Sequence, residues 1–463
     1  MTSRTFTAED QLAFATLSGD FNPLHVDPVQ ARRLMFGAPA VHGVHTLLWC
    51  LDAWSERVDG PFALTALKAT FARPLRVDQP VEMTIRKDDG GKVRLLATSS
   101  GETVARVDFE WTGRDGTDSG VEAKTFPAAA PVEHQSYDGL TGELPLALDP
   151  DSLARLLPRL AGRMGADQLA AILATTRLVG MECPGLHSVF SELDIGFLQP
   201  SPAPVAWRVT QADTRFGLVV MELESPGLKG EVRAFIRPAP RRQLSFEAAR
   251  GLVAPGAFAG QRAVVVGGSR GLGEVVAKLL AAGGAEVLAT YHQGAADAEA
   301  LTAEITAGGG SAACGALNVL DPQTTDAAVA GWGPSHLYYF ATPFIATGPR
   351  GGFSQPLFEK FCAYYVSGLH RIAALFDGPQ LAGVFCPSSV FVEETPDVLV
   401  EYATAKASGE YVCALLAKRR PGLKVSWPRL PKMDTDQTAA LGEGEEADPA
   451  PVMLAHLLEF HGS

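Results

Sequence analysis

The segment that begins at Arg262 restricts the fold of this chain more than any other. It reads R-A-V-V-V-G-G-S-R-G-L-G-E-V-V-A-K-L-L, which predicts a buried strand, a tight glycine-rich turn and a helix in immediate succession. Beyond it, apolar strands alternate with helical stretches. Such alternation is typical of a parallel sheet covered by helices, so we expect an α/β, Rossmann-type doubly wound domain over residues 260–463.

The first 240 residues follow a different pattern and contain a weak internal repeat. The motif L-x-x-x-F-x-x-P at residues 67–74 recurs at residues 193–200, an offset of 126 residues. Each copy follows an apolar helical stretch and continues into strands of alternating polarity. We expect one helix and one antiparallel sheet in each copy. Two such sheets can pair edge to edge, so that the second copy replaces the partner subunit of a dimer.

Two segments rich in Pro, Gly and polar residues divide the chain, near residues 117–134 and 238–260. We therefore predict three domains, over residues 1–118, 135–240 and 260–463. A length of 463 residues agrees with this division at about 150 residues per domain.

Charge and composition exclude several classes of protein. The 52 acidic and 39 basic residues give a formal net charge of -13, which argues against a nucleic-acid-binding or membrane-binding chain. The N-terminus lacks a signal-peptide pattern, and no stretch approaches about 18 uninterrupted apolar residues, so we expect a cytoplasmic protein. The six cysteines are scattered without a C-x-x-C pair, and we predict neither a disulfide framework nor a metal site.

The stretch L-S-G-D-F-N-P-L-H-V-D, which starts at Leu17, is followed by F-G-A-P-A-V-H-G-V-H-T. It resembles the MaoC-like, (R)-specific enoyl-CoA hydratases of hot-dog fold, whose motif G-D-x-N-P-[LIV]-H is present at residues 19–25. The resemblance extends loosely over residues 1–115. It implies an α+β double hot-dog for the two copies of the repeat.

Hydration of an enoyl thioester needs a base at oxygen and an acid at the alpha carbon, on one face. The resemblance implies that Asp20 and His25 are this catalytic pair and that Asn22 orients them. It also implies that the backbone N–H of Gly43, at a helix start, polarises the thioester carbonyl. In the second copy, the offset places Leu146 opposite Asp20, so we predict that this copy has lost catalysis. The offset also places Gln168 opposite His42.

The glycine spacing G-x-x-x-G-x-G at residues 267–273 resembles the short-chain dehydrogenase/reductase family. Ser389 stands thirteen residues before Tyr402, which stands four before Lys406, and this matches the family's Ser, Tyr and Lys set. The resemblance implies that Tyr402 moves the proton during hydride transfer and that Ser389 holds the carbonyl or hydroxyl. Lys406, one helical turn after Tyr402, favours the phenolate and reaches the nicotinamide ribose.

The cofactor is predicted from the end of the second strand, where NAD-preferring members usually have an acid. Residues 290–292 read Thr-Tyr-His, and Arg270 lies inside the glycine loop, so we expect NADP(H) in preference to NAD(H). The expected cofactor-binding residues are Gly267, Ser269, Arg270, Gly271, Leu272, Gly273, Tyr291, Asn318 and Lys406.

Three departures from the reductase pattern bear on its activity. Val266 stands where the family usually has Thr, residues 340–343 read F-A-T-P in place of N-N-A-G, and Tyr365 stands in place of the helix Asn. They leave open whether Tyr365 substitutes for the Asn, whether turnover is slow, or whether this domain only binds a cofactor.

The two implied sites share one intermediate, a (3R)-hydroxyacyl thioester. We therefore predict a bifunctional 3-oxoacyl-thioester reductase and (3R)-hydroxyacyl-thioester dehydratase that acts on acyl-CoA or on thioesters of an acyl carrier protein. The alternatives are the oxidative direction, in which enoyl-CoA hydration precedes dehydrogenation, and a hydratase with a non-catalytic reductase-like domain. Family resemblance also implies a homo-oligomer formed through the reductase domain.

Overall fold

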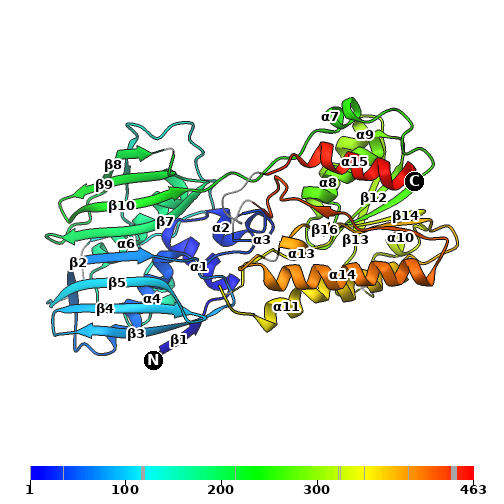
Figure 1. Cartoon of the computed structure of the whole chain (residues 1–463). Coiled ribbons are helices and arrows are strands. Elements are labelled where there is room, and N and C mark those ends of the chain that lie inside the picture. The colour runs from blue at the N-terminus through cyan, green and yellow to red at the C-terminus, as the bar shows by residue number, and fades with distance from the viewer. Residues whose placement is uncertain are drawn as a thin grey trace. The chain divides into compact units, whose positions relative to one another are not determined.

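The computed structural model describes residues 2–34, 36–115, 120–213, 215–321, 323, 325–348, 350–394, 396–438 and 446–462. The chain forms two compact units, Met1–Ala239 and Pro240–Ser463 (Figure 1). The boundaries of the three predicted domains stay a prediction. Among the described residues, no helix combines the length and apolarity that a membrane span requires.

The first unit contains a ten-stranded antiparallel sheet in the order β1-β3-β4-β5-β2-β7-β10-β9-β8-β6. Its strands are β1 (Thr2–Thr5), β2 (Phe62–Phe71), β3 (Pro80–Asp88), β4 (Lys92–Ser99), β5 (Glu102–Gly113), β6 (Thr141–Leu144), β7 (Ser188–Phe197), β8 (Val205–Asp213), β9 (Leu218–Ser225) and β10 (Leu228–Ile236). Its helices are α1 (Ala8–Ser18), α2 (Pro23–Val26), α3 (Pro28–Ala31), α4 (Gly43–Ser55), α5 (Pro150–Leu156), α6 (Ala166–Arg177) and the π-helical η1 (Leu178–Glu182).

The structure confirms the internal repeat. Adding 126 to the bounds of β2 gives those of β7, and adding 126 to the bounds of β4 gives those of β9. The two copies meet where β2 pairs with β7, and at the centre of this pairing Lys68 faces its own equivalent, Asp194. The Lys68 Nζ lies 2.7 Å from the Asp194 Oδ2. An identical second copy would place two like charges at this position, which is unfavourable in cross-strand pairs.

The helices of both copies share one hydrophobic core with the sheet. α4 and α6 contact each other, and both are buried along nearly their whole length. Leu67 and Leu193, which are equivalent in the repeat, belong to the same buried cluster as Trp54 and Ile172. Neither copy therefore has a closed core of its own.

The second unit is the predicted doubly wound α/β domain. Its parallel sheet has the order β13-β12-β11-β14-β15-β17, and a further pair joins β16 to β18. The strands are β11 (Arg262–Val266), β12 (Glu286–Tyr291), β13 (Ser311–Ala316), β14 (His336–Tyr339), β15 (Gly383–Phe385), β16 (Ser388–Ser389), β17 (Lys424–Ser426) and β18 (Arg429–Leu430). The helices are α7 (Phe246–Leu252), α8 (Gly271–Ala282), α9 (Ala295–Ala307), α10 (Ala327–Ala330), α11 (Gln355–Cys362), the π-helical η3 (Ala363–Gly368), α12 (Leu369–Leu375), α13 (Phe391–Glu394), α14 (Val400–Arg419) and α15 (Pro449–Gly462).

The uninterrupted apolar sequence of β11 follows from burial on both faces. Ala263 and Val265 pack into one core cluster, whereas Val264 and Val266 pack into a second. Helices therefore cover both sides of this strand, as expected for a parallel sheet. The chain reverses its direction of winding between β11 and β14, which is the place where such sheets bind ligands.

The shared core of the first unit predicts that its two copies unfold together. Leu193→Ala should cost about 2–5 kcal/mol, because it leaves a cavity at a fully buried position. Hydrogen–deuterium exchange should then accelerate in β5 of the first copy as well as in β7. The exposed Lys229→Ala serves as the control and should change neither. Acceleration confined to the second copy would contradict a shared core.

Candidate active sites

The local chain path places Asp20 in the interior of the first unit. α1 ends at Gly19, which has a left-handed φ of 81°. A Cβ on Gly19 would lie 2.7 Å from the Arg177 Cδ and 2.9 Å from the Phe126 Cγ, so only glycine fits. Asn22 caps α2, and Pro23 occupies its first turn. This turn leaves Asp20 1% exposed and carries His25 to the same cavity.

Asp20 of the first copy is held by α6 and η1 of the second. The Thr176 Oγ1 donates a 2.6 Å hydrogen bond to the Asp20 Oδ2, and the Asn22 backbone N–H donates to the Oδ1 at 3.2 Å. A Cβ on Gly180 would lie 2.1 Å from the same Oδ1, so glycine is required there. Burial raises the pKa of Asp20, while His25 and the Thr176 hydrogen bond act in the opposite direction.

Asn22 joins the two copies rather than contacting the carboxylate through its side chain. Its Nδ2 donates to the Gly180 carbonyl at 2.9 Å and lies 3.2 Å from the Gly185 carbonyl oxygen. Its Oδ1 accepts from the Leu24 N–H at 3.0 Å. The amide thus fixes the loop between Asp20 and His25 against η1.

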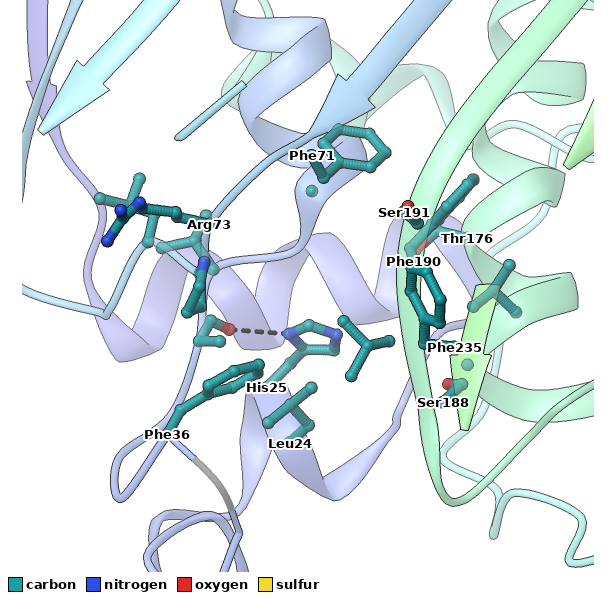
Figure 2. A pocket seen from close by; sticks show the side chains of 18 of the residues that line it. Leu24, His25, Phe36, Phe71, Arg73, Thr176, Ser188, Phe190, Ser191 and Phe235 are labelled. Carbon is teal, nitrogen blue, oxygen red and sulfur yellow. Dashed lines mark hydrogen bonds between the residues drawn. The ribbon is translucent and has the colours of Figure 1, made fainter. Parts of the chain in front are cut away.

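His25 presents one ring nitrogen to the cavity. Its Nδ1 lies 2.7 Å from the Ala40 carbonyl oxygen, so this nitrogen carries the proton and donates (Figure 2). The Nε2 of the neutral ring is then an acceptor. Burial lowers the pKa of His25, although Asp20 and the Ala40 carbonyl oppose this shift.

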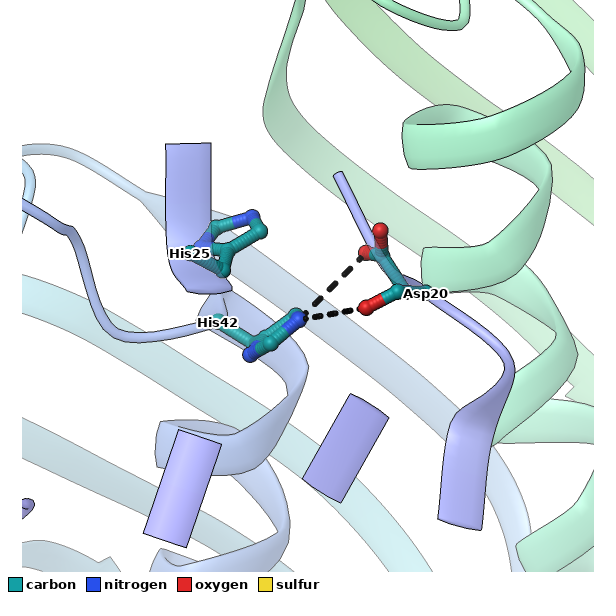
Figure 3. A group of neighbouring side chains, drawn as sticks. All are labelled: Asp20, His25 and His42. Atoms are coloured by element: carbon teal, nitrogen blue, oxygen red, sulfur yellow. Dashed lines mark hydrogen bonds and ion pairs between the residues drawn. The ribbon is translucent and has the colours of Figure 1, made fainter. Parts of the chain in front are cut away.

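His42 lies behind the pair and has a polar partner on each side. Its Nε2 lies 3.0 Å from the Asp20 carbonyl oxygen and 3.9 Å from the Asp20 Oδ2, and its Nδ1 lies 2.9 Å from the Gln11 Oε1 (Figure 3). The ring stacks on that of His25 with 3.8 Å between centroids. Gln11 also bonds to the buried His45 at 3.3 Å. Burial lowers the pKa of His42 and of His45.

Asp20, His25 and His42 have atoms within 4.8 Å of one another, which is close enough to hold a metal ion. The hydrogen bonds favour acid–base chemistry instead. The His25 Nδ1 and the His42 Nε2 each face a backbone carbonyl oxygen, so these two nitrogens carry protons and offer no lone pair to an ion beside the Asp20 carboxylate.

Gly43 opens α4 and lines the same cavity. The first N–H groups of a helix have no intrahelical acceptor, and among the described residues no side chain caps this end of α4. A Cβ on Gly43 would lie 2.9 Å from a ring carbon of Phe71, so glycine is required where β2 passes the helix. The helix start thus offers backbone donors and a favourable dipole to an oxygen in the cavity.

Both copies of the repeat build the cavity, which has a volume of about 490 Å³. Figure 2 shows His25, Phe36 and Phe71 from the first copy opposite Phe190 and Phe235 from the second. A buried carboxylate, an imidazole acceptor and free backbone donors thus surround one largely apolar space. This arrangement can take a proton from water and stabilise negative charge on a carbonyl oxygen.

Sequence reasoning missed the contribution of Thr176 and Gly180. The repeat aligns Gly180 with Trp54, and a glycine within an apolar helical stretch signals a close approach of another group. Two further aligned positions, Leu146 opposite Asp20 and Gln168 opposite His42, lie in the interior of the first unit. Leu146 is buried in the shared core, and Gln168 bonds to the N–H and carbonyl of Leu64 at 3.0 and 2.8 Å.

The glycine loop of the second unit has the shape that a dinucleotide requires. Gly267 and Gly271 have left-handed φ angles of 77° and 56°. A Cβ on Gly273 would lie 2.2 Å from the Gly267 carbonyl oxygen. α8 begins at Gly271 without a side-chain cap among the described residues, so its first N–H groups are available to a pyrophosphate.

The other predicted cofactor residues have the following surroundings. Ser269 is buried. Leu272 is partly buried and packs against a hydrophobic core of the second unit. Tyr291 is the last residue of β12 and is half-buried. The Asn318 Oδ1 accepts from the Leu320 N–H at 3.0 Å. Arg270 lies 3.8 Å from the Asp436 carboxylate, which therefore balances part of its charge.

Tyr402 and Lys406 lie on α14, which contacts the strand that carries Ser389. The Lys406 Nζ lies 5.9 Å from the centre of the Tyr402 ring and donates to the Pro387 carbonyl at 2.9 Å. Ser389 is buried, and its Oγ accepts from the Phe391 N–H at 3.3 Å. The fold thus brings the three predicted catalytic residues to one end of α14.

Tyr365 occupies this site in place of the family's Asn. Its ring packs edge-on against Tyr402 at 5.7 Å, and the Lys406 Nζ lies 4.2 Å above its centre. The hydroxyl bonds to the Thr342 Oγ1 at 2.6 Å, and burial raises the pKa of Tyr365. Tyr365 lies in the π-helical turn η3. The face of the Tyr365 ring thus contacts the Lys406 ammonium. Because its pKa is raised, the Tyr365 phenol is protonated at neutral pH.

Comparisons with known families match one segment in each unit of the chain. Residues 1–108 match the family described as "MaoC like domain", and residues 261–333 match the family described as "short chain dehydrogenase". The chain thus carries a MaoC-like domain at its N-terminus and a short-chain dehydrogenase domain in the second unit, which confirms both predicted resemblances. The second domain is of the class that binds a nicotinamide dinucleotide.

Individual relatives match over short segments. The chain is 36% identical over 102 residues to the peroxisomal multifunctional enzyme type 2 of Drosophila melanogaster, a match that covers 21% of the chain and 17% of that enzyme. It is 54% identical over 41 residues to the peroxisomal hydratase-dehydrogenase-epimerase of Saccharomyces cerevisiae, covering 9% of the chain and 5% of that enzyme. The (R)-specific enoyl-CoA hydratase of Aeromonas caviae is 52% identical over 42 residues, covering 9% of the chain and 31% of that enzyme.

The chain thus spans less than a third of the length of each of these relatives. Among solved structures, a short-chain dehydrogenase from Burkholderia cenocepacia in complex with NADP is 25% identical with a TM-score of 0.38. That match covers 44% of this chain and 91% of the other.

The second copy should tune the carboxyl group of the first. Thr176→Val removes a hydrogen bond that favours the charged form of Asp20, so the Asp20 pKa, already above its ordinary value, should rise further. NMR titration of the isotope-labelled carboxyl measures this shift, and Asp20→Asn assigns the signal. Thr175→Val is the matched control, because the Thr175 Oγ1 donates to the Ile172 carbonyl of its own helix. An unchanged Asp20 pKa in Thr176→Val would contradict this role.

Proposed function

We propose that the chain is a bifunctional enzyme that reduces 3-oxoacyl thioesters and dehydrates the resulting (3R)-hydroxyacyl thioesters to enoyl thioesters. The substrates are thioesters of CoA or of an acyl carrier protein. The two reactions share the hydroxyacyl thioester, so one chain carries out consecutive steps.

The dehydratase half rests chiefly on the convergence of Asp20, His25 and the start of α4 on one cavity. In the direction of hydration, the Asp20 carboxylate and the His25 Nε2 bind one water and remove its proton. The same pair delivers a proton to the alpha carbon on the same face. The Gly43 N–H stabilises the enolate-like oxygen of the thioester through its position at the helix start.

The reductase half rests on the glycine cradle of α8 and on the Ser389, Tyr402 and Lys406 set. A bound nicotinamide would supply the hydride. Tyr402 donates the proton to the carbonyl oxygen, which Ser389 holds, and the Lys406 ammonium lowers the cost of the phenolate that remains. Tyr365 and Thr342 keep Lys406 in place where the family uses an Asn.

Two observations favour alternative functions. The similarity to the peroxisomal hydratase-dehydrogenase-epimerase favours the oxidative direction, in which hydration precedes dehydrogenation. The replacement of the family's Asn by Tyr365 favours a reductase-like domain that binds a cofactor without turnover. The predicted preference for NADP(H) favours the reductive direction, which is the direction of the main proposal.

Separate substitutions should disable the two activities independently. Asp20→Asn and His25→Gln should each lower crotonyl-CoA hydration by at least about 100-fold, and Tyr402→Phe should lower NADPH-dependent reduction of acetoacetyl-CoA by a similar factor. Each variant should keep the other activity. Asp27→Asn is the control for Asp20→Asn and should keep both activities. Asp27 caps the N-terminus of α3, and the amide oxygen of Asn can accept the same backbone hydrogen bonds. A wild type that hydrates crotonyl-CoA but does not reduce acetoacetyl-CoA would leave only the hydratase function.

The cofactor preference should depend on Arg270. NADPH should bind at least about tenfold more tightly than NADH, because a guanidinium–phosphate hydrogen bond contributes about 1.5–3 kcal/mol. Arg270→Met should remove this preference without weakening NADH binding, as measured by titration calorimetry. Tighter binding of NADH by the wild type would contradict the assignment of NADP(H).

A further inference from the structure

A buried cation lies in the wall of the hydratase cavity. Arg237 directly follows β10 in the second copy, is 3% exposed and lines the cavity that contains Asp20 and His25. Its backbone N–H donates to the His187 carbonyl at 2.7 Å, and its Nη2 donates to the Leu186 carbonyl. These bonds fix both ends of the residue.

Two of the three guanidinium nitrogens of Arg237 lack a partner in the part of the chain that the structure describes. The Nε and Nη1 of Arg237 are buried, and neither has an acceptor among the described residues. Within the residues that the structure describes, no carboxylate forms an ion pair with Arg237. Burial lowers its pKa to about 10, so the side chain is still charged at neutral pH. Buried charges in proteins are normally paired, because an unpaired charge loses its hydration without compensation.

The surroundings of Arg237 are those of a recognition site for one polar group. Val189, Phe235 and Ile236 form an apolar wall on the second-copy side of the cavity. Ser188, which pairs with Ile236 across the strands, adds a buried hydroxyl to this wall (Figure 2). A few polar groups in an apolar cavity are the usual means of fixing one feature of a ligand.

The position of Arg237 indicates which part of a thioester it meets. Its charge acts on His25, and the Leu186 carbonyl that it binds also accepts from the Asn22 amide at 3.3 Å. Arg237 therefore lies at the catalytic end of the cavity. The phosphates of CoA or of an acyl carrier are separated from the thioester by the pantetheine arm. A group that reaches Arg237 belongs to the acyl chain.

We propose that Arg237 and Ser188 form a subsite for a carboxylate carried by the acyl chain, so that the preferred substrates are thioesters of dicarboxylic acids. This inference rests on the proposed function, because it takes the cavity to be the acyl-thioester site. The second copy of the repeat thereby selects the substrate, although it has lost the catalytic pair.

Calorimetric titration of the full chain with two saturated thioesters tests the subsite without turnover. Hexanoyl-CoA and adipoyl-CoA have six-carbon acyl chains and differ by the terminal carboxylate. The wild type should bind adipoyl-CoA at least about tenfold more tightly, as expected for a charged hydrogen bond. Arg237→Met should reduce this ratio to about one. Arg73→Met is the matched control and should keep the ratio, because Arg73 lines the same cavity but is exposed and paired with Glu102 at 2.8 Å.

Three outcomes would overturn the proposal: equal or weaker binding of adipoyl-CoA by the wild type, a ratio that survives in Arg237→Met, or equal weakening of both ligands in that variant. The last outcome would place Arg237 against a part common to both ligands, such as a phosphate. The wild-type ratio alone decides the matter if Arg237→Met does not fold. A tenfold preference without any hydration of crotonyl-CoA would support the subsite and refute the hydratase function, so the two failures are distinguishable.

Discussion

The pairing of β2 with β7 is the interaction on which the first active site depends. It joins the two copies of the repeat into one sheet and brings α6 and η1 of the second copy against the loop that carries Asp20. A carboxyl group that is 1% exposed needs partners in the interior, and Thr176 supplies one of them from across the pairing. Gly180 leaves the space that the carboxylate fills. The second copy is thus part of the candidate site.

Loss of symmetry between the copies has a physical benefit. Two identical copies would place lysine against lysine at the centre of the pairing, whereas the fused chain places Lys68 against Asp194. An exposed pair of this kind contributes at most about 1 kcal/mol. It nevertheless disfavours pairing between first copies of two chains. The second copy contributes the buried Ser188 and Arg237 to the wall of this cavity.

The reductase site illustrates a different compensation. The family's Asn is absent, and Tyr365 takes its place in a π-helical turn, under the Lys406 ammonium and bonded to Thr342. The face of the Tyr365 ring attracts the Lys406 ammonium, and the ammonium also donates a hydrogen bond to the Pro387 carbonyl. Lys406 is thus held next to Tyr402 by contacts with Tyr365 and with the Pro387 carbonyl. Tyr402 and Lys406 therefore stay close together although the family's Asn is absent.

The sequence by itself determined the fold classes, the repeat at an offset of 126 residues and the positions of both candidate sites. These depend on local features: the glycine spacing at residues 267–273, the G-D-x-N-P-x-H turn, and a helical interval of four between Tyr402 and Lys406. Tertiary structure alone decided that Thr176, Gly180 and Arg237 belong to the site of the first copy. They lie more than 150 residues from Asp20 along the chain, and no local pattern marks which carboxylate a distant threonine will meet. Only the packing of two copies around one core places them there, because the partners of a buried group are set by what the fold brings beside it.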